Sequence, residues 1–230
     1  PAERVLRIHA RPESQLAQML DGPGAPDLSG LRLGICARDG ELELTVRGDT
    51  GAAGALERHL VGALGAALFS TDGRTVDDIV AAGLAAAGHT VSVAESCTGG
   101  GLGARLSARA GASAHFVGGV VAYSNGVKTA VLGVPERIIA DHGAVSAECA
   151  RAMADGVRRL TGSTWALSIT GVAGPGGGTD EKPVGLVHVG RAGPDGTISR
   201  EYRLRGDRDQ VRRSSVAAAL HLLRLGLTEG

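Results

Sequence analysis

Three apolar segments of this 230-residue chain, residues 90–94, 117–121 and 165–169, run directly into stretches rich in glycine and polar side chains. Short apolar runs with such boundaries are typical of buried strands. Helical patterns surround them; Thr75, for example, precedes an apolar helical face that ends at Gly88. Because ligands of open α/β sheets bind beyond the carboxyl ends of the strands, this order predicts an α/β domain with its site in the loops that follow the strands.

These loops carry most of the groups that could act on a ligand. Residues 95–100 read Glu-Ser-Cys-Thr-Gly-Gly and lead into a helix, which can aim backbone N–H groups and hydroxyls at an anion. An ordinary glycine-rich turn is the alternative. Residues 170–183 are rich in glycine but lack the Gly-Lys-Ser/Thr of a P-loop. They suit close approach of a ligand to the backbone, with a flexible linker as the alternative.

Lysine is kept at only two positions. Of the 24 lysine and arginine residues, only Lys128 and Lys182 are lysine. A desolvated lysine ammonium can lose its proton, whereas a guanidinium effectively cannot, so a lysine kept against this bias is a candidate for proton transfer. Chance retention of two solvated lysines is the alternative. Both lie in the part of the chain that is richest in motifs.

The first 74 residues predict a separate, smaller α+β unit. We expect residues 1–27 to be a linker with a helix remnant that ends in a proline- and glycine-rich loop, and residues 28–74 to form the small domain. Within it, alternating apolar segments flank Asp39-Gly40, which indicates a β-hairpin. Gly51-Ala-Ala-Gly54 matches the Gly-x-x-Gly of RNA-binding KH loops, but the flanking charges are not basic, so nucleic-acid binding is not expected there.

Composition excludes several other classes of function. The 24 acidic and 24 basic residues balance, and only five residues are aromatic, so the chain is poorly suited to stacking nucleic-acid bases. Three widely separated cysteines and no closely spaced histidine pair predict no disulfide framework, no structural metal and no cofactor. Without a membrane-length apolar run or a leader, we expect a cytoplasmic protein, and the start at Pro1 is expected to be that of a fragment.

Six motifs cover most of residues 75–225. They are A-E-S-C-T-G-G at 94–100, G-A-S-A-H-F at 111–116, G-V-V-A-Y-S-N-G-V-K at 119–128, H-G-A-V-S at 142–146, T-G-V-A-G-P-G-G-G-T-D-E-K-P-V-G at 170–185 and G-D-R-D-Q-V-R-R at 206–213. Together they resemble the carboxy-terminal domain of the CinA family, whose enzymatically active members are nicotinamide mononucleotide amidohydrolases, also called PncC. The resemblance implies a three-layer α/β catalytic domain with a mixed sheet over residues 75–230, preceded by a KH-like segment. It also implies a homo-oligomer, a dimer. The pyrophosphatase domain that comes first in full-length CinA proteins is not expected in this chain.

The resemblance further implies a serine nucleophile at Ser113, with Tyr123 and Lys128 as its proton-handling partners. The family often has Gly-Ser-Ser where this chain has Gly-Ala-Ser, and the second serine is kept. Without the resemblance, Ser96 and Ser124 are equal candidates for the nucleophile. Cys97 has no histidine near it in sequence and is interpreted as a packing residue.

Substrate binding is expected of glycine, hydroxyl, amide and charged residues in the loops and at the entry to the last helix. These are Glu95, Ser96, Thr98, Gly99, Gly100, Asn125, Thr170, Gly171, Gly174, Lys182, Arg208 and Arg212. The implied reaction is deamidation of nicotinamide mononucleotide to nicotinic acid mononucleotide and ammonia. A non-catalytic nucleotide-binding module of a larger competence/damage-inducible CinA protein is the alternative, and the presence of Ser113, Tyr123 and Lys128 together favours the enzyme.

Overall fold

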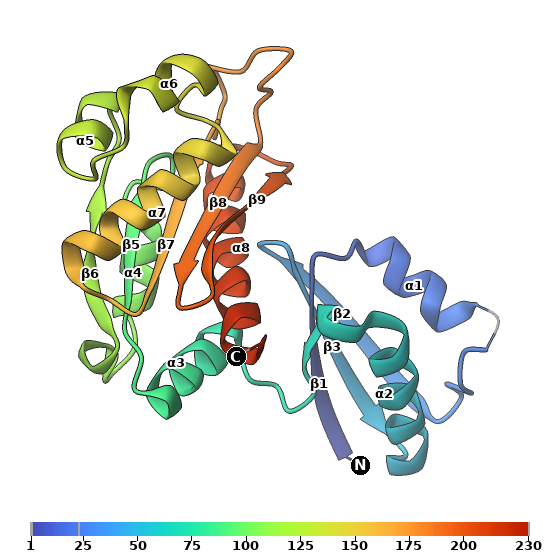
Figure 1. Ribbon diagram of the computed structural model, residues 1–230. Helices are drawn as coiled ribbons and strands as arrows, with labels where there is room; N and C mark the ends of the chain where they lie inside the picture. Colours follow the sequence, from blue (N-terminus) through green and yellow to red (C-terminus); the bar gives the residue numbers. More distant parts are fainter. Residues whose placement is uncertain (1, 23, 230) are drawn as a thin grey trace. The chain divides into compact units, whose positions relative to one another are not determined.

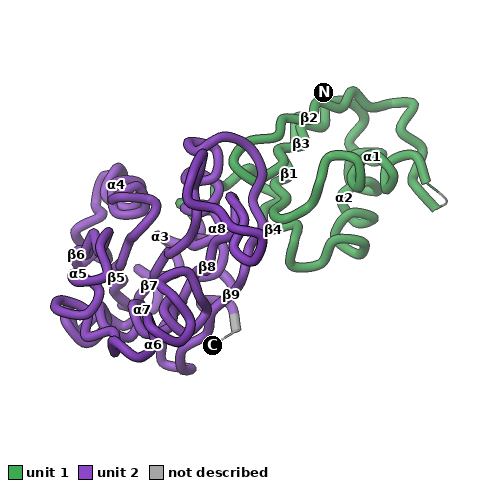
Figure 2. The backbone as a smooth tube through the Cα atoms, turned by 90° about the horizontal axis from the view of Figure 1, so that it is seen from above, with its two compact units in different colours: residues 1–78 green, residues 79–230 purple. Residues whose placement is uncertain are grey.

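The computed structural model describes residues 2–22 and 24–229, so Pro23 in the predicted proline- and glycine-rich loop lies outside the described residues. The chain forms two compact units, residues 1–78 and 79–230 (Figure 2). Each unit has its own sheet (Figure 1). In the described part of the chain, no helix combines the length and the apolar character needed to cross a bilayer.

The first unit is a four-stranded antiparallel sheet in the order β2-β3-β1-β4, with two helices packed on one face. Its elements are β1 (Ala2–His9), α1 (Glu13–Asp21), β2 (Leu31–Arg38), β3 (Glu41–Gly48), α2 (Thr50–Leu64) and β4 (Leu68–Ser70). The core lies between that face and the helices, where Leu6 and Ile8 of β1 meet Leu56 and Leu60 of α2. This is the small α+β unit that the sequence predicts.

The prediction of a linker with a helix remnant over residues 1–27 is wrong at its start, where residues 2–9 form β1; the helix is present as α1. β1 lies inside the sheet, paired along its whole length with β3 on one side and through Arg7 and Ile8 with β4 on the other. Its alternation of buried Leu6 and Ile8 with more exposed neighbours is that of a strand with one covered face. The partner strand begins at Glu41, so the segment read alone carries no sign of the pairing.

The β2–β3 hairpin is confirmed. Arg38 pairs with Glu41, and the two turn residues have positive φ angles, 54° at Asp39 and 84° at Gly40. Those angles are what a two-residue turn between right-handed strands requires. The Gly-x-x-Gly match at residues 51–54, in contrast, lies in the first turns of α2 and not in a loop, with Asp49 Oδ1 accepting from the N–H of Ala52 at 2.8 Å. Helical residues of this kind do not form a KH-type loop.

The second unit is a three-layer α/β domain. Its elements are α3 (Val76–Ala87), β5 (Val91–Glu95), α4 (Gly101–Ser107), β6 (Phe116–Val121), α5 (Asn125–Ala130), α6 (Glu136–His142), α7 (Ala147–Thr161), β7 (Trp165–Gly171), β8 (Leu186–Gly193), β9 (Gly196–Arg203) and α8 (Arg208–Glu229). The sheet order is β6-β5-β7-β8-β9; β5 runs parallel to β6 and β7, and the pairs β7–β8 and β8–β9 are antiparallel. This mixed sheet, together with the α+β unit before it, confirms the predicted fold class.

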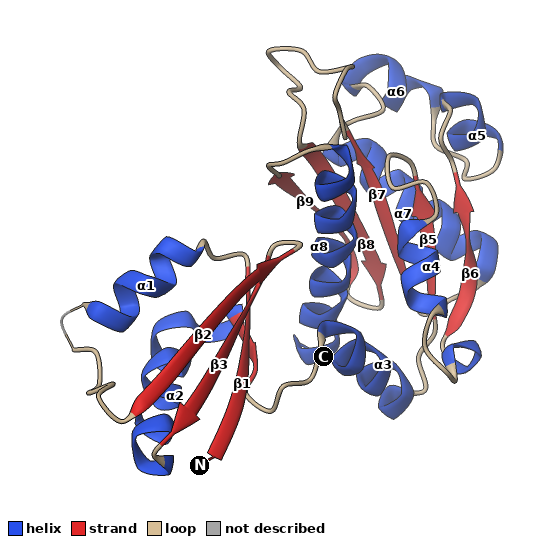
Figure 3. Ribbon diagram, turned by 180° about the vertical axis from the view of Figure 1, so that it is seen from behind, coloured by secondary structure: helices blue, strands red, loops and turns tan. Residues whose placement is uncertain are grey.

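Helices cover both faces of the mixed sheet. α7 lies on the near face in Figure 1, and α4 and α8 lie on the other face, which is nearer in Figure 3. Neighbouring residues of β8 show the two directions: a Cβ on Gly190 would meet Ala150 of α7, whereas Arg191 donates to the carbonyl of Leu222 in α8. β5, β7 and β8 are therefore buried on both sides, as a continuous apolar run indicates. β6, predicted to be a buried strand, lies instead at the edge of the sheet, where Val117 and Val121 are about half exposed.

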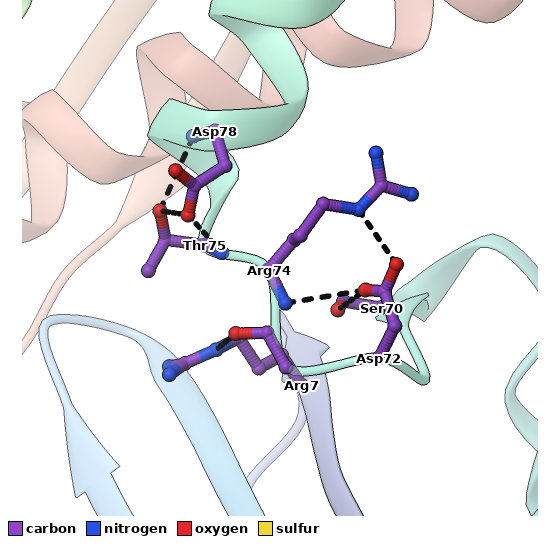
Figure 4. Close-up of polar contacts among 7 residues, drawn as sticks. Arg7, Ser70, Asp72, Arg74, Thr75 and Asp78 are labelled. Carbon is purple, nitrogen blue, oxygen red and sulfur yellow. Dashed lines mark hydrogen bonds and ion pairs between the residues drawn. The ribbon is translucent and has the colours of Figure 1, made fainter.

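The chain enters the second unit through a capped helix. Asp78 Oδ2 accepts from the N–H of Thr75 at 2.8 Å, and Thr75 Oγ1 accepts from the N–H of Asp78 at 3.2 Å (Figure 4). This reciprocal pair satisfies N–H groups that the first turn of α3 would otherwise leave without partners. The prediction of Thr75 as a helix cap is confirmed.

The parallel pairing of β5, β6 and β7 decides where the polar loops meet. The three strands end at Glu95, Val121 and Gly171. In the register of the sheet, Glu95 pairs with Val121 of β6 and with Ile169 of β7, the residue before Thr170. The loops that follow therefore leave the sheet from one edge. α8 begins near the same edge, because β9 ends opposite Leu186, the first residue of β8.

We predict that Ile8→Ala destabilises the first unit by about 2–5 kcal/mol, because Ile8 is fully buried and its loss leaves a cavity between β1 and the helices. Val5→Ala on the opposite face of β1 should cost less. Hydrogen exchange of the β3 amides, followed by mass spectrometry, should quicken strongly in Ile8→Ala alone. Unchanged exchange in β3 would mean that β1 is a peripheral attachment.

Candidate active site

Lys128 is the centre of the site, although it comes from a short helix. Its side chain is 1 % exposed, and its Nζ lies 2.8 Å from the carbonyl oxygen of Ala122, 3.1 Å from that of Tyr123 and 3.1 Å from Ser96 Oγ. Ala122 and Tyr123 directly follow β6, and Ser96 directly follows β5. The two parallel strand ends therefore bring a lysine and a serine hydroxyl into hydrogen-bonding contact.

Burial of Lys128 disfavours its charged form. Burial of the ammonium lowers the pKa of Lys128 below the ordinary value of 10.5, because desolvation disfavours the charged form. A neutral amine has two N–H donors and one lone pair. The two carbonyl oxygens can take the two donors, which leaves the lone pair for the hydroxyl hydrogen of Ser96. This arrangement suits a base that accepts a proton from serine.

Glu95, which was predicted to bind substrate, is bonded to the chain itself. Its carboxylate is 1 % exposed and accepts from three backbone N–H groups at the start of α4, those of Gly100 (3.2 Å), Leu102 (2.9 Å) and Gly103 (2.8 Å). The N–H groups expected to face a ligand anion are thus partly taken up by the chain's own carboxylate. The expectation that Glu95 binds substrate is not supported by these contacts.

Two glycines let the loop after β5 fold back on Glu95. Gly99 and Gly100 have φ angles of 60° and 98°, backbone conformations that residues other than glycine rarely adopt. The turn is closed further by the N–H of Gly99, which donates to the carbonyl of Ser96 at 3.0 Å. These two glycines therefore act in this structure by shaping the loop that carries Ser96.

Two arginines of α8 reach the same loops. Arg208 donates to the carbonyl of Gly174 at 2.7 Å and to the hydroxyl of Tyr123 at 3.3 Å, while Arg212 donates to the carbonyl of Thr98 at 2.9 Å. They are four residues apart, so they lie on one face of the helix. These contacts bring Arg208 together with Gly174 and Tyr123, and Arg212 together with Thr98; their role in the site stays a prediction.

Tyr123 and Thr98 differ in their exposure. The side chain of Tyr123 is 60 % exposed, and its hydroxyl, which accepts from Arg208, can donate its own hydrogen to another group. Thr98 is fully buried, and within residues 2–22 and 24–229 its Oγ1 has no hydrogen-bond partner; the same holds for Nε of Arg212. Thr98 Oγ1 and Arg212 Nε are therefore two polar atoms of this contact that could each form a further hydrogen bond.

Ser113 lies at the other edge of the sheet. It belongs to a 3-10 helix, Ala112–Ala114, that precedes β6, and the first residue of β6, Phe116, pairs with Val91 at the start of β5. Tyr123 and Lys128 follow the end of β6, so the length of this strand, about 17–20 Å, separates them from Ser113. The expectation that Ser113 works with Tyr123 and Lys128 is not supported by this structure, which sets Ser96 beside Lys128 instead.

The other candidate nucleophiles have different surroundings. Ser124 caps α5, where its Oγ accepts from the N–H of Val127 at 3.3 Å. Burial raises the pKa of the Cys97 thiol to about 11, so the nucleophilic thiolate is disfavoured. This agrees with the interpretation of Cys97 as a packing residue.

The remaining predicted binding residues lie around this edge with partners of their own. Thr170 Oγ1 donates to the carbonyl of Ala144 at 2.7 Å, and Lys182 Nζ donates to the carbonyl of His142 at 2.6 Å. The first contact ties the end of β7 to the segment between α6 and α7, and the second ties the loop after β7 to the last residue of α6. Gly171 is in close contact with β8, since a Cβ there would lie 2.7 Å from the carbonyl oxygen of Leu186. Asn125, the first residue of α5, is exposed.

Sequence reasoning missed two features of the site. One is the pair of carbonyl groups, at Ala122 and Tyr123, that hold Lys128; backbone acceptors leave no mark in side-chain identity. The other is the cap formed by Glu95, for which a signal was present: a single carboxylate ending an apolar strand just before a glycine-rich helix start. Among the described residues, no group of three or more His, Cys, Asp or Glu is placed to hold a metal ion.

Comparison with known proteins identifies the domain. The family model described as the CinA C-terminal domain matches residues 73–227. A CinA-like protein of Mycobacterium sp. (strain JLS) is 48% identical over 98% of this chain and 55% of its own length, and one of Anaeromyxobacter dehalogenans (strain 2CP-1) is 44% identical over 99% of this chain and 57% of its own. The chain therefore spans little more than half the length of these relatives.

Solved structures agree with the sequence comparison. A CinA superfamily protein from Klebsiella pneumoniae 700603 is 35% identical, with a TM-score of 0.65 over 68% of this chain and 100% of its own. The competence/damage inducible protein CihA from Agrobacterium tumefaciens is 37% identical, with a TM-score of 0.63 over 66% of this chain and 95% of its own. This chain belongs to the CinA family, and residues 73–227 are its CinA C-terminal domain.

Proposed function

We propose that this chain is an amidohydrolase that deamidates nicotinamide mononucleotide to nicotinic acid mononucleotide and ammonia, with Ser96 as the nucleophile and Lys128 as its base. The observation that carries the proposal is the contact of 3.1 Å between Lys128 Nζ and Ser96 Oγ, formed by a buried lysine with a lowered pKa. A nucleophile in contact with a neutral amine is the arrangement of serine–lysine hydrolases. Ser96 thus takes the role that the resemblance gave to Ser113.

The reaction would proceed in two halves. Neutral Lys128 accepts the Ser96 proton as Oγ attacks the carboxamide carbon, and the resulting ammonium returns that proton to the amide nitrogen, so that ammonia leaves and an acyl-serine remains. Water then attacks the acyl carbon, gives a proton to Lys128, and releases the carboxylic acid as Ser96 regains its hydrogen. Tyr123, which accepts from Arg208, would donate its own hydroxyl hydrogen to the substrate.

The charges around Ser96 favour an anionic substrate such as a nucleotide. Arg208 and Arg212 project from one face of α8 toward the loops after β5 and β7. Guanidinium groups bind phosphate oxygens with paired hydrogen bonds. Because Glu95 already takes N–H groups at the start of α4, the phosphate is assigned to the arginine side chains and not to that helix end.

A non-catalytic nucleotide-binding module would not require this site chemistry. Binding an anion favours a charged lysine that points at the ligand, whereas Lys128 is enclosed and directed at two carbonyls and a serine. Burial of a lysine beside a hydroxyl disfavours the positive charge that would bind an anion, and it provides a base for the hydroxyl. The enzyme is therefore the better explanation of the site.

Ser96→Ala is expected to reduce kcat for ammonia release by at least about 1000-fold, with nucleotide affinity within a few-fold of the unsubstituted protein, because a nucleophile acts on the transition state. Ser113→Ala is the matched control and should retain most activity. Release of ammonia from nicotinamide mononucleotide measures both. The opposite ranking of the two variants would return the nucleophile to Ser113.

Lys128→Arg is expected to be nearly as inactive as Lys128→Ala, with a loss of about 100- to 10,000-fold, because arginine stays protonated and cannot act as the base. Lys182→Arg is the control, since Lys182 contacts the carbonyl oxygen of His142 at the end of α6, and an arginine can also donate to that oxygen. Robust turnover by Lys128→Arg would show that Lys128 contributes charge and no proton transfer.

The pH dependence should follow Lys128. The base is active when neutral, so kcat/KM should fall about tenfold per pH unit as the pH drops below the pKa of Lys128, and should level off above it. Because burial lowers this pKa, the midpoint should lie below the ordinary value of 10.5. A profile of kcat/KM against pH measures the midpoint, and a limb centred at or above 10.5 would contradict the neutral-lysine mechanism.

A further inference from the structure

Glu95 is a buried carboxylate that the proposed reaction does not use. It is 1 % exposed, and its side-chain partners in the described part of the chain are the three N–H groups of Gly100, Leu102 and Gly103. An ionised group in such a place needs compensation for lost water, and several charge-assisted hydrogen bonds from amides at a helix start supply it. The carboxylate therefore holds a defined orientation.

The contacts of Glu95 close a ring around the nucleophile. The chain leaves Glu95, passes through Ser96 and the two left-handed glycines, and returns to the same residue where the N–H of Gly100 donates to Oε2. The N–H of Ser96 also donates to the carbonyl of Ile169 in β7 at 2.9 Å. The position of Ser96 is thus fixed by the strand before it and by a carboxylate that holds the helix after it.

The main chain of the same residue leads to the base. The carbonyl of Glu95 accepts from the N–H of Ala122 at 2.7 Å, and the carbonyl of Ala122 accepts from Lys128 Nζ at 2.8 Å. One residue thereby links both reacting groups: its backbone connects to the support of Lys128, and its side chain connects to the loop that carries Ser96. A shift of Glu95 would change the distance between nucleophile and base.

We propose that Glu95 is a positioning residue, whose carboxylate holds the loop 96–100 so that Ser96 Oγ stays within reach of Lys128. The inference rests on the role of Ser96 in the proposed function. It replaces substrate binding as the role of Glu95, and it assigns the start of α4 to the chain's own carboxylate.

Glu95→Gln is the test, because it keeps the side-chain length but replaces one acceptor oxygen by an NH₂ group, which would face a backbone N–H. A misplacement of about 1 Å at a reacting group can cost about 100-fold in rate. We expect kcat to fall about 10- to 100-fold with KM within about threefold. We also expect covalent labelling of Ser96 by a serine-directed sulfonyl fluoride to slow in parallel, with the pH midpoint of labelling unchanged.

Asp78→Asn is the matched control for loss of a carboxylate that caps a helix, since Asp78 caps α3 through Thr75, and α3 precedes β5 whereas Ser96 follows it. It should lower the thermal unfolding temperature and leave kcat and the labelling rate unchanged. If Glu95→Gln does not fold, Glu95→Asp, which keeps the charge on a shorter arm, should fold and label Ser96 at an intermediate rate.

The outcomes separate this inference from the proposed function. Labelling of Ser96 without ammonia release in the unsubstituted protein would count against the amidohydrolase alone, and the labelling rates would still decide the role of Glu95. A raised KM with normal kcat and labelling would return Glu95 to substrate binding. Three results would each overturn the positioning role. Glu95→Gln could label Ser96 at the unchanged rate, or it could shift the pH midpoint of labelling while the rate at the high-pH plateau stays constant. The third result is no labelling of Ser96 in the unsubstituted protein.

Discussion

The enclosure of Lys128 is the constraint on which the rest of the site depends. An amine without water must find hydrogen-bond partners in the protein, and this one finds two carbonyl oxygens and one hydroxyl. Those carbonyls are available because β6 stops pairing with β5 beyond Val121 and the chain turns into α5. The base therefore exists only where a parallel strand ends beside another that delivers a serine.

Hydrogen bonds also join the separate loops into one site. Arg208 links the loop after β7 to Tyr123 after β6, and Arg212 links α8 to the loop after β5. Three segments far apart in the sequence are thus held by two guanidinium groups with several donors each. The strong preference of this chain for arginine fits such linking roles, because one planar guanidinium can bond to two groups at once, as Arg208 does.

The sequence predicted local structure better than it predicted the partners of residues. The hairpin at Asp39-Gly40 and the cap at Thr75 follow from turn and cap chemistry within a few residues, and both are confirmed. β1 was missed because its partner β3 lies more than 30 residues away and only the pairing makes it a strand. The resemblance favoured Ser113, near Lys128 in sequence, but a residue that precedes a strand and one that follows it lie at opposite ends of that strand.

Glu95 and Lys128, the two buried ionisable groups of the site, have separate hydrogen-bond partners. Glu95 is satisfied by backbone N–H groups and Lys128 by backbone C=O groups, each at a strand end. A direct ion pair would stabilise the lysine ammonium and raise the pKa of Lys128, which would remove the neutral amine that a base requires. Neutral backbone carbonyls satisfy the N–H groups of Lys128 without the full charge of a carboxylate, so burial can still lower its pKa. Because the two groups have separate partners, Glu95 can fix the loop that carries Ser96 while Lys128 remains able to accept the proton of Ser96.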